Sequence, residues 1–171
     1  MRWLRFSIVV LIVMVLQTGN LLNIIAFPPL NIKPNFLLIM LVFFAINTDS
    51  YDAIITSFAL GLACDISSGP LGPFFLSYGL LGSALAHLKK MFVIRKNLHY
   101  SITIFCMSLL TAALASLLLY LKGTSLSSNT FLFLLGTALY SSVVGPYINW
   151  PLNSIKRWLG IDRHRFRPRS G

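Results

Sequence analysis

Long apolar runs are the feature that most restricts how this chain can fold. The run from Ile102 to Leu121 contains no charged residue, and its polar members are little more than Ser and Thr. Hydrophobic residues make up 56% of the 171 residues and charged residues 11%, against about 45–50% and about 25% in soluble domains. The mean hydropathy is +0.78. We therefore predict an integral membrane protein.

Uninterrupted runs of this length favour helices over strands. A membrane barrel shows segments of about 10 residues in which apolar and polar positions alternate, whereas the runs of this chain are continuous. A spanning helix takes about 20 residues. We predict an all-α integral membrane protein, a bundle of about six transmembrane helices that forms a single polytopic domain over residues 1–171.

The turn residues between the apolar runs divide them into spans. A polar hinge from Asn47 to Asp52 separates the second span from the third, and its Asp49, Ser50 or Asp52 is expected to serve as an N-cap. The second and third spans are short, so a re-entrant hairpin is an alternative to two crossings. The six spans are predicted at Leu4 to Leu22, Pro34 to Ile46, Ala53 to Ile66, Gly72 to Leu88, Ser101 to Leu121 and Thr130 to Trp150.

The distribution of Lys and Arg predicts the orientation. Six spans with both termini in the cytoplasm leave only Lys33 and Lys122 outside. This topology accounts for the net charge of +10, which therefore does not indicate nucleic-acid binding. The basic residues predicted to be cytoplasmic are Arg2, Arg5, Lys89, Lys90, Arg95, Lys96, Lys156, Arg157, Arg163, Arg165, Arg167 and Arg169.

Residues 155–171 are predicted to form a basic cytoplasmic tail. Basic residues alternate there with Trp158, Leu159, Ile161 and Phe166, which is typical of a segment that lies at the interface of a membrane rich in anionic lipid. Prolines at 146 and 151 are expected to kink or end the sixth span before this tail.

Asp65 is the one acidic residue embedded in hydrophobic sequence. An ionisable group at membrane depth is costly and usually has a partner or a function. Asp65 also lies at the C-terminal end of its span, where the helix macrodipole disfavours a negative charge. Three roles stay open: pinning the structure, through Lys33 or the N–H groups of the Ser67–Leu71 turn, contact with a partner or ligand, and proton or ion transfer.

Small residues gather on one face of each of the third and fourth spans. Small side chains let helix backbones approach closely in lipid, so we expect these two spans to pack against each other. The first face holds Ser57, Gly61 and Asp65, spaced i, i+4 and i+8, and the second holds Gly79, Gly82, Ser83 and Ala86.

Nothing in the sequence indicates an enzyme. The chain has no Glu, no Ser/His/Asp set, no phosphate-binding glycine loop and no metal-ligand spacing. Cys64 and Cys106 each stand alone in an apolar run, which is typical of small buried side chains. We therefore expect no catalytic residue, metal or cofactor.

The pattern Gly61-Leu62-x-x-Asp65, followed by Gly69-x-Leu71-Gly72-x-x-x-Leu76, resembles the signature of the bacterial rod shape-determining protein MreD family. Gln17 late in the first span and Pro34-Asn35-x-Leu37-Leu38 at the start of the second agree with it. Asn35 stands where many relatives are expected to have Asp. The signature positions that we expect to bind a partner or to maintain the structure are Gln17, Pro34, Gly61, Asp65, Gly69, Leu71, Gly72 and Gly79.

The resemblance implies a non-enzymatic, multi-pass protein of the bacterial cytoplasmic (inner) membrane. Such a protein would bind the bitopic protein MreC and work with MreB, a SEDS glycosyltransferase and a class B transpeptidase, helping to organise peptidoglycan synthases in cell-wall elongation. The small-residue faces around Gly61 and Gly79 and the outer Ser67–Gly72 turn are where a partner helix is expected. The basic tail is expected to meet anionic lipid or a cytoplasmic filament.

A second hypothesis belongs to another class. The substrate-binding membrane subunits of energy-coupling-factor vitamin transporters have a similar size and about six spans, and we expect the two folds to be related. Such subunits hold a small ligand in a pocket lined by outer loops. The outer loops of this chain are short and carry few polar groups beyond Asn31, Lys33 and residues 122–130, which argues against a tight vitamin site.

Overall fold

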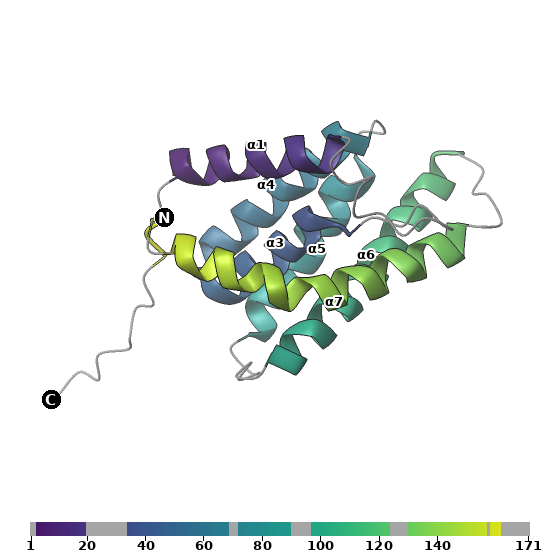
Figure 1. Ribbon diagram of the computed structural model, residues 1–171. Helices are drawn as coiled ribbons and strands as arrows, with labels where there is room; N and C mark the ends of the chain where they lie inside the picture. The colour runs from purple at the N-terminus through teal and green to yellow at the C-terminus, as the bar shows by residue number, and fades with distance from the viewer. Residues whose placement is uncertain are drawn as a thin grey trace, which may run out of the picture.

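The computed structural model describes residues 3–19, 34–68, 72–89, 97–123, 130–156 and 158–161. Over these residues the secondary structure consists of helices, with no strand, which confirms the predicted helical bundle (Figure 1). The helices are α1 (Trp3–Thr18), α3 (Phe36–Asn47), α4 (Ser50–Ser68), α5 (Pro73–Leu88), α6 (Asn97–Leu121) and α7 (Thr130–Lys156).

The helix bounds follow the predicted spans, and the largest difference is at the end of α7, which stops at Lys156 and not at Trp150. The predicted hinge before the third span is also shorter than expected. Helix α4 begins at Ser50, so only Thr48 and Asp49 remain outside helices in the predicted hinge. Of the three candidate N-caps, Asp49 holds the position before the helix, and its carbonyl oxygen accepts a hydrogen bond from the Ala53 N–H at 2.8 Å. The other two candidates lie in the first turn of α4.

Helix α7 does not end at its prolines, so that part of the prediction was wrong. The helix runs through Pro146 and Pro151 to Lys156. Packing on neighbouring helices holds the chain helical across both prolines: a side chain at Gly145 would overlap Ile104 of α6, and Leu152 is buried. Packing of this kind offsets the backbone hydrogen bond that each interior proline removes.

The first part of the tail folds back into the protein. Gly160 has a positive φ of 67°, and the Ile161 N–H donates to the Lys156 carbonyl at 3.2 Å, as in a Schellman motif. This turn buries Leu159 and Ile161 in the core. The predicted interfacial segment is therefore wrong for these two residues, whereas residues 162–171 lie outside the described part of the chain.

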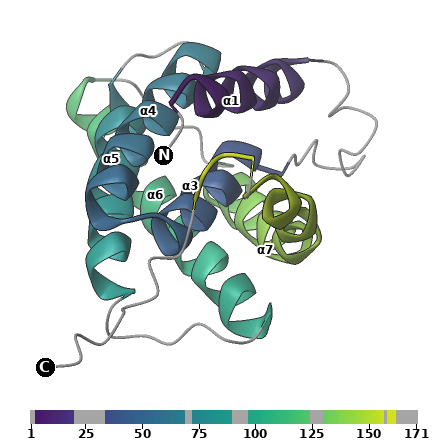
Figure 2. The ribbon, with the colours of Figure 1, turned by 90° about the vertical axis from the view of Figure 1, so that its left-hand side faces the viewer.

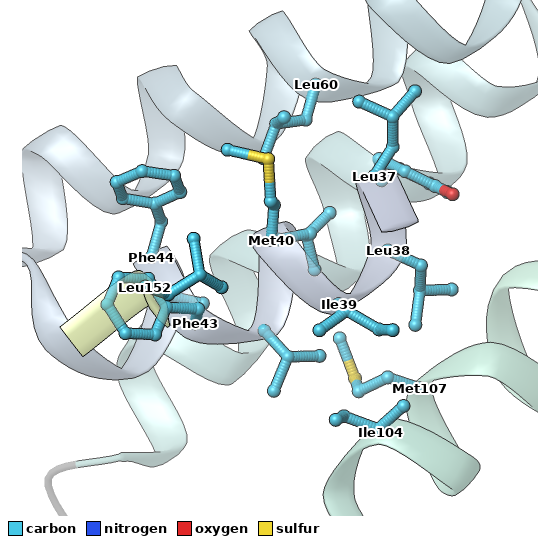
Figure 3. Close-up of a cluster of buried hydrophobic side chains, with 14 of the residues drawn as sticks. Leu37, Leu38, Ile39, Met40, Phe43, Phe44, Leu60, Ile104, Met107 and Leu152 are labelled. Carbon is cyan, nitrogen blue, oxygen red and sulfur yellow. The ribbon is translucent and has the colours of Figure 1, made fainter. Parts of the chain in front are cut away.

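Helix α3 occupies the centre of the bundle, among α1, α4, α5, α6 and α7 (Figure 2). Every residue from Leu37 to Ala45 is at most 2% exposed. A helix that is apolar on all sides has no face to give to solvent and is buried for that reason. Met40 points toward Leu60 of α4, and Ile39 points toward α6 (Figure 3).

Helices α4 and α5 approach each other through glycines, as the small-residue faces predict. A Cβ atom at Gly61 would lie 2.7 Å from the Phe74 carbonyl oxygen and 2.8 Å from the Phe75 Cα atom. Side chains at Gly79 and Gly82 would overlap Phe58 and Ser57 of α4. The predicted packing of the third and fourth spans is thus confirmed, and it occupies the space beside Gly61, Gly79 and Gly82.

Basic residues gather at the end of the bundle where α3 terminates. The Lys156 ammonium donates to Asn47 Oδ1 at 2.7 Å, and the Lys89 ammonium donates to the Thr48 carbonyl. Positive charge at the C-terminus of α3 is favoured by its macrodipole. Lys122 lies at the opposite end, next to Gly72. Lys89 and Lys156 thus lie at one end of the bundle and Lys122 at the other, and the sides of the membrane that these ends face stay a prediction.

The close approach of α4 and α5 yields a test. Gly61→Ala should lower the free energy of unfolding by about 1–3 kcal/mol, because the new methyl group meets backbone atoms that cannot rotate away. Thermal unfolding in detergent measures the loss. Ala84→Leu, which adds more bulk to an exposed position of α5, serves as the control and should leave stability nearly unchanged. Equal stability of Gly61→Ala and wild type would contradict this packing.

Candidate functional site

The carboxylate of Asp65 joins α4 to the start of α5. Its Oδ2 atom accepts hydrogen bonds from the Gly72 N–H at 2.8 Å and the Phe75 N–H at 2.9 Å, and its Oδ1 atom accepts one from the Phe74 N–H at 2.9 Å. Asp65 is 1% exposed. Both carboxylate oxygens are thus occupied by backbone donors from the next helix.

This arrangement explains why an acidic residue is tolerated at the end of α4. The first N–H groups of a helix have no partner within it and are normally satisfied by a side chain at the N-cap. The N-cap of α5 is Gly72, which has a φ of 114° and no side chain to offer. Asp65 supplies the missing cap from the preceding helix, and its charge lies at the positive end of the α5 macrodipole.

Among the roles considered for Asp65, the structure shows hydrogen bonds that pin two helices together. The donors differ from the expected ones, because Gly72, Phe74 and Phe75 lie beyond the Ser67–Leu71 turn. The other expected partner, Lys33, lies outside the described residues.

A second group of polar side chains surrounds the start of α3, and we call Gln17, Asn35, Tyr78 and Ser141 the α3 cap cluster. Asn35 is the N-cap of α3, and its Oδ1 atom accepts from the Leu38 N–H at 3.1 Å. Its Nδ2 atom donates to the Tyr78 hydroxyl at 2.8 Å. One amide therefore closes α3 and ties it to α5.

The remaining members of the α3 cap cluster come from the first and last helices. The Gln17 Oε1 atom accepts from the Leu37 N–H at 3.2 Å, and its Nε2 atom donates to Asn35 Oδ1 at 3.5 Å. The Asn35 N–H donates to Ser141 Oγ at 3.0 Å. Helices α1, α3, α5 and α7 therefore meet through polar contacts at one point inside an otherwise apolar bundle.

The residues of the predicted signature fall into two neighbouring places. Gly61, Asp65, Gly72 and Gly79 lie on the α4–α5 contact, whereas Gln17 and the buried Pro34 lie at the start of α3. Gly69 and Leu71 lie outside the described residues. The cluster and the α4–α5 contact are linked by Tyr78, because its Cβ atom lies 3.0 Å from a Cβ atom built at Gly61.

Tyr78 and Ser141 were not identified from the sequence, and Asn35 was identified only as a departure from the family pattern. An Asn immediately before an apolar run is a typical N-cap, so that signal could have given Asn35 its role. No comparable signal marks Tyr78, which is fully buried although it is polar.

The polar groups of the site hold helix ends in place. The three N–H donors hold the Asp65 carboxylate, and the amides of the α3 cap cluster satisfy backbone groups. Over the described part of the chain, no three His, Cys, Asp or Glu side chains come together as metal ligands would. The arrangement fixes the relative positions of helices.

These features define an apolar helical bundle whose buried polar groups hold helix ends together. The sequence model of the rod shape-determining protein MreD family matches residues 1–145, and the chain belongs to this family. Membership gives it a role in rod shape determination and associates it with the membrane and the shape-determining complex. The match covers every signature residue. Curated proteins and solved structures gave no match, so the suggested relation to vitamin transporter subunits has no support.

The capping role of Asp65 can be measured. Asp65→Ala leaves three N–H groups at the start of α5 without their acceptor, and we expect the free energy of unfolding to fall by about 2–4 kcal/mol. Asp49→Ala removes an exposed carboxylate from the position just before α4 and should cost about 1 kcal/mol, the typical loss at an N-cap. Thermal unfolding of the two variants in detergent decides the matter, and equal losses would contradict the assignment.

The link between α3 and α5 depends on one hydroxyl group. Tyr78→Phe removes the acceptor of the Asn35 amide without changing the ring, so we expect a loss of about 1 kcal/mol. Tyr147→Phe is the matched control, because Tyr147 is 78% exposed. Chemical unfolding of both variants in mixed micelles measures the difference. If Tyr78→Phe were as stable as its control, the Tyr78 hydroxyl would not stabilise the contact between α3 and α5.

Proposed function

We propose that the protein is a non-enzymatic, multi-pass component of the cell-wall elongation machinery in the bacterial cytoplasmic membrane. In this proposal it binds an MreC-like bitopic protein and helps to organise peptidoglycan synthases together with MreB, a SEDS glycosyltransferase and a class B transpeptidase. The observation that carries the proposal is the family match over residues 1–145, which includes the Asp65 cap.

Placement in the membrane is supported by the exposed apolar surface. One described helix, from His99 to Leu121, is long and apolar enough to cross a membrane, and only 28% of its apolar window is buried. Three shorter apolar helices accompany it. Soluble proteins rarely expose large apolar patches, so lipid is the natural neighbour of the large apolar side chains exposed on α6 and α7: Ile102, Leu110, Leu117, Leu121, Leu139, Val143, Tyr147 and Trp150.

Aromatic residues at the basic end support the position of an interface there, and the basic residues among them support the orientation. Trp and Tyr are enriched at membrane–water interfaces. Trp3 begins α1, Tyr51 lies in the first turn of α4, and Trp150 and Trp158 lie near the end of α7, each of them exposed. Their neighbours Arg5, Lys89 and Lys156 make this the cytoplasmic face in our proposal.

The partner surface that we propose lies at the outer end of α4 and α5. The faces around Gly61 and Gly79 are filled by contacts between these two helices, so a partner helix must bind elsewhere. Ile66 is 54% exposed and Leu76 is 44% exposed, and both flank the connection that Asp65 braces. An apolar partner helix would pack there against the connection between α4 and α5, which the Asp65 hydrogen bonds hold in place.

A pull-down from native membranes tests both the function and the surface. Tagged wild-type protein should recover an MreC-like protein or wall synthases, identified by mass spectrometry. A double variant, Ile66→Ala with Leu76→Ala, should reduce that recovery severalfold. The matched control, Leu139→Ala with Val143→Ala on α7, removes exposed apolar side chains elsewhere and should recover the partner normally.

Two outcomes would overturn these proposals separately. Recovery of cytoplasmic ATPases with a bound vitamin would replace the proposed function with that of a transporter subunit. Normal recovery of an MreC-like protein by both double variants would leave the function standing and remove the outer end of α4 and α5 as the partner surface.

A further inference from the structure

The two termini of the described chain meet at the basic end of the bundle. Arg5 of α1 and Trp158, which follows α7, lie at the end where α1 begins and α7 stops (Figure 1). The Arg5 Nη1 atom donates to the Trp158 carbonyl at 2.6 Å, and the Arg5 Cζ atom lies 4.9 Å from the centroid of the Trp158 ring. The Schellman turn at Gly160 holds Trp158 in place.

Arg5 has more hydrogen-bonding capacity than this contact uses. A guanidinium group carries five N–H donors, and one of them reaches the Trp158 carbonyl. Within the described ranges, Arg5 has no carboxylate partner. Two acidic residues of the described chain, Asp49 and Asp52, lie at the start of α4. Lys89 and Lys156 add positive charge nearby, around the C-terminus of α3.

An apolar stripe runs along α1 from Arg5. Ile8, Ile12 and Leu16 follow it at i+3, i+7 and i+11, so they share one helix face with it. They are 44%, 51% and 39% exposed. From Arg5 to Leu16 the helix rises about 16 Å, which is about half of the hydrocarbon thickness of a bilayer. Arg5 thus lies at one end of an exposed apolar stripe whose length matches the thickness of one leaflet of a bilayer.

We infer that Arg5, Trp158 and this stripe form a binding site for an anionic phospholipid. The guanidinium fork would take the lipid phosphate in two hydrogen bonds, which is a geometry that suits arginine. An acyl chain would lie along Ile8, Ile12 and Leu16. A free phosphate could use only the first half of this site, so the apolar stripe favours the lipid. The inference rests on the proposed membrane placement and on no partner protein.

Native mass spectrometry of the full-length protein in detergent tests the site. Wild-type protein should retain dioleoyl phosphatidylglycerol in preference to dioleoyl phosphatidylcholine at equal concentrations. Arg5→Gln should reduce that preference about fivefold, as expected for one interfacial basic residue. Lys122→Gln removes an exposed cation from the opposite end and should change nothing. Arg5→Gln also removes the Arg5–Trp158 contact and can lower the stability of the protein. We therefore compare, for each variant, the unfolding temperature with and without each lipid, so that the effect of the lipid is measured apart from this loss.

Two further variants separate this site from its alternatives. Replacing the four tail arginines, at 163, 165, 167 and 169, by Gln should preserve the preference for phosphatidylglycerol. Loss of the preference in this variant, with Arg5→Gln unaffected, would assign the lipid to the tail and overturn the inference. Ile8→Ala with Ile12→Ala should weaken retention of phosphatidylglycerol. Unchanged retention there, together with full displacement by millimolar inorganic phosphate, would reduce the site to a phosphate contact.

Discussion

The hydrogen bonds of the Asp65 carboxylate are the constraint on which the rest of the bundle depends. They join the end of one helix to the start of the next, and they do so where α5 has no capping side chain of its own. With α5 held in this position, Gly61 can meet its backbone and Tyr78 is brought to Asn35. The start of α3 is therefore positioned indirectly by a carboxylate on another helix.

Helix α3 is stabilised by apolar contacts along its length and by polar contacts at its ends. The apolar side chains of α3 fill the centre, whereas the side chains that bond to the two ends of this helix are polar. Gln17 and Asn35 satisfy N–H groups at its start, and Lys89 and Lys156 meet its end. In the proposed membrane placement, apolar burial gives little drive for association between helices, so such end contacts would set which helices meet and in what register.

The sequence was sufficient to predict the helices and the face that α4 turns to α5, because apolar runs and small residues at helical spacing depend on local order alone. It also marked Asp65 as unusual. The identity of its donors could not be predicted, because they lie seven to ten positions further along the chain and their approach depends on how α4 and α5 cross. The end of α7 could not be predicted from Pro151 for the same reason. A proline disfavours helix locally, but here packing between helices in the folded bundle outweighs that preference.

If the protein is a multi-pass membrane protein, as we propose, the length of α3 has a consequence for how it is inserted. Twelve residues make a helix of about 18 Å, well short of a hydrocarbon core of about 30 Å. Such a segment is a poor substrate for independent insertion, and two of its first N–H groups find their acceptors on the side chains of Gln17 and Asn35. Helix α3 must therefore reach its place after or together with its neighbours. Biogenesis of this bundle is a problem of ordered assembly as much as of span-by-span translocation.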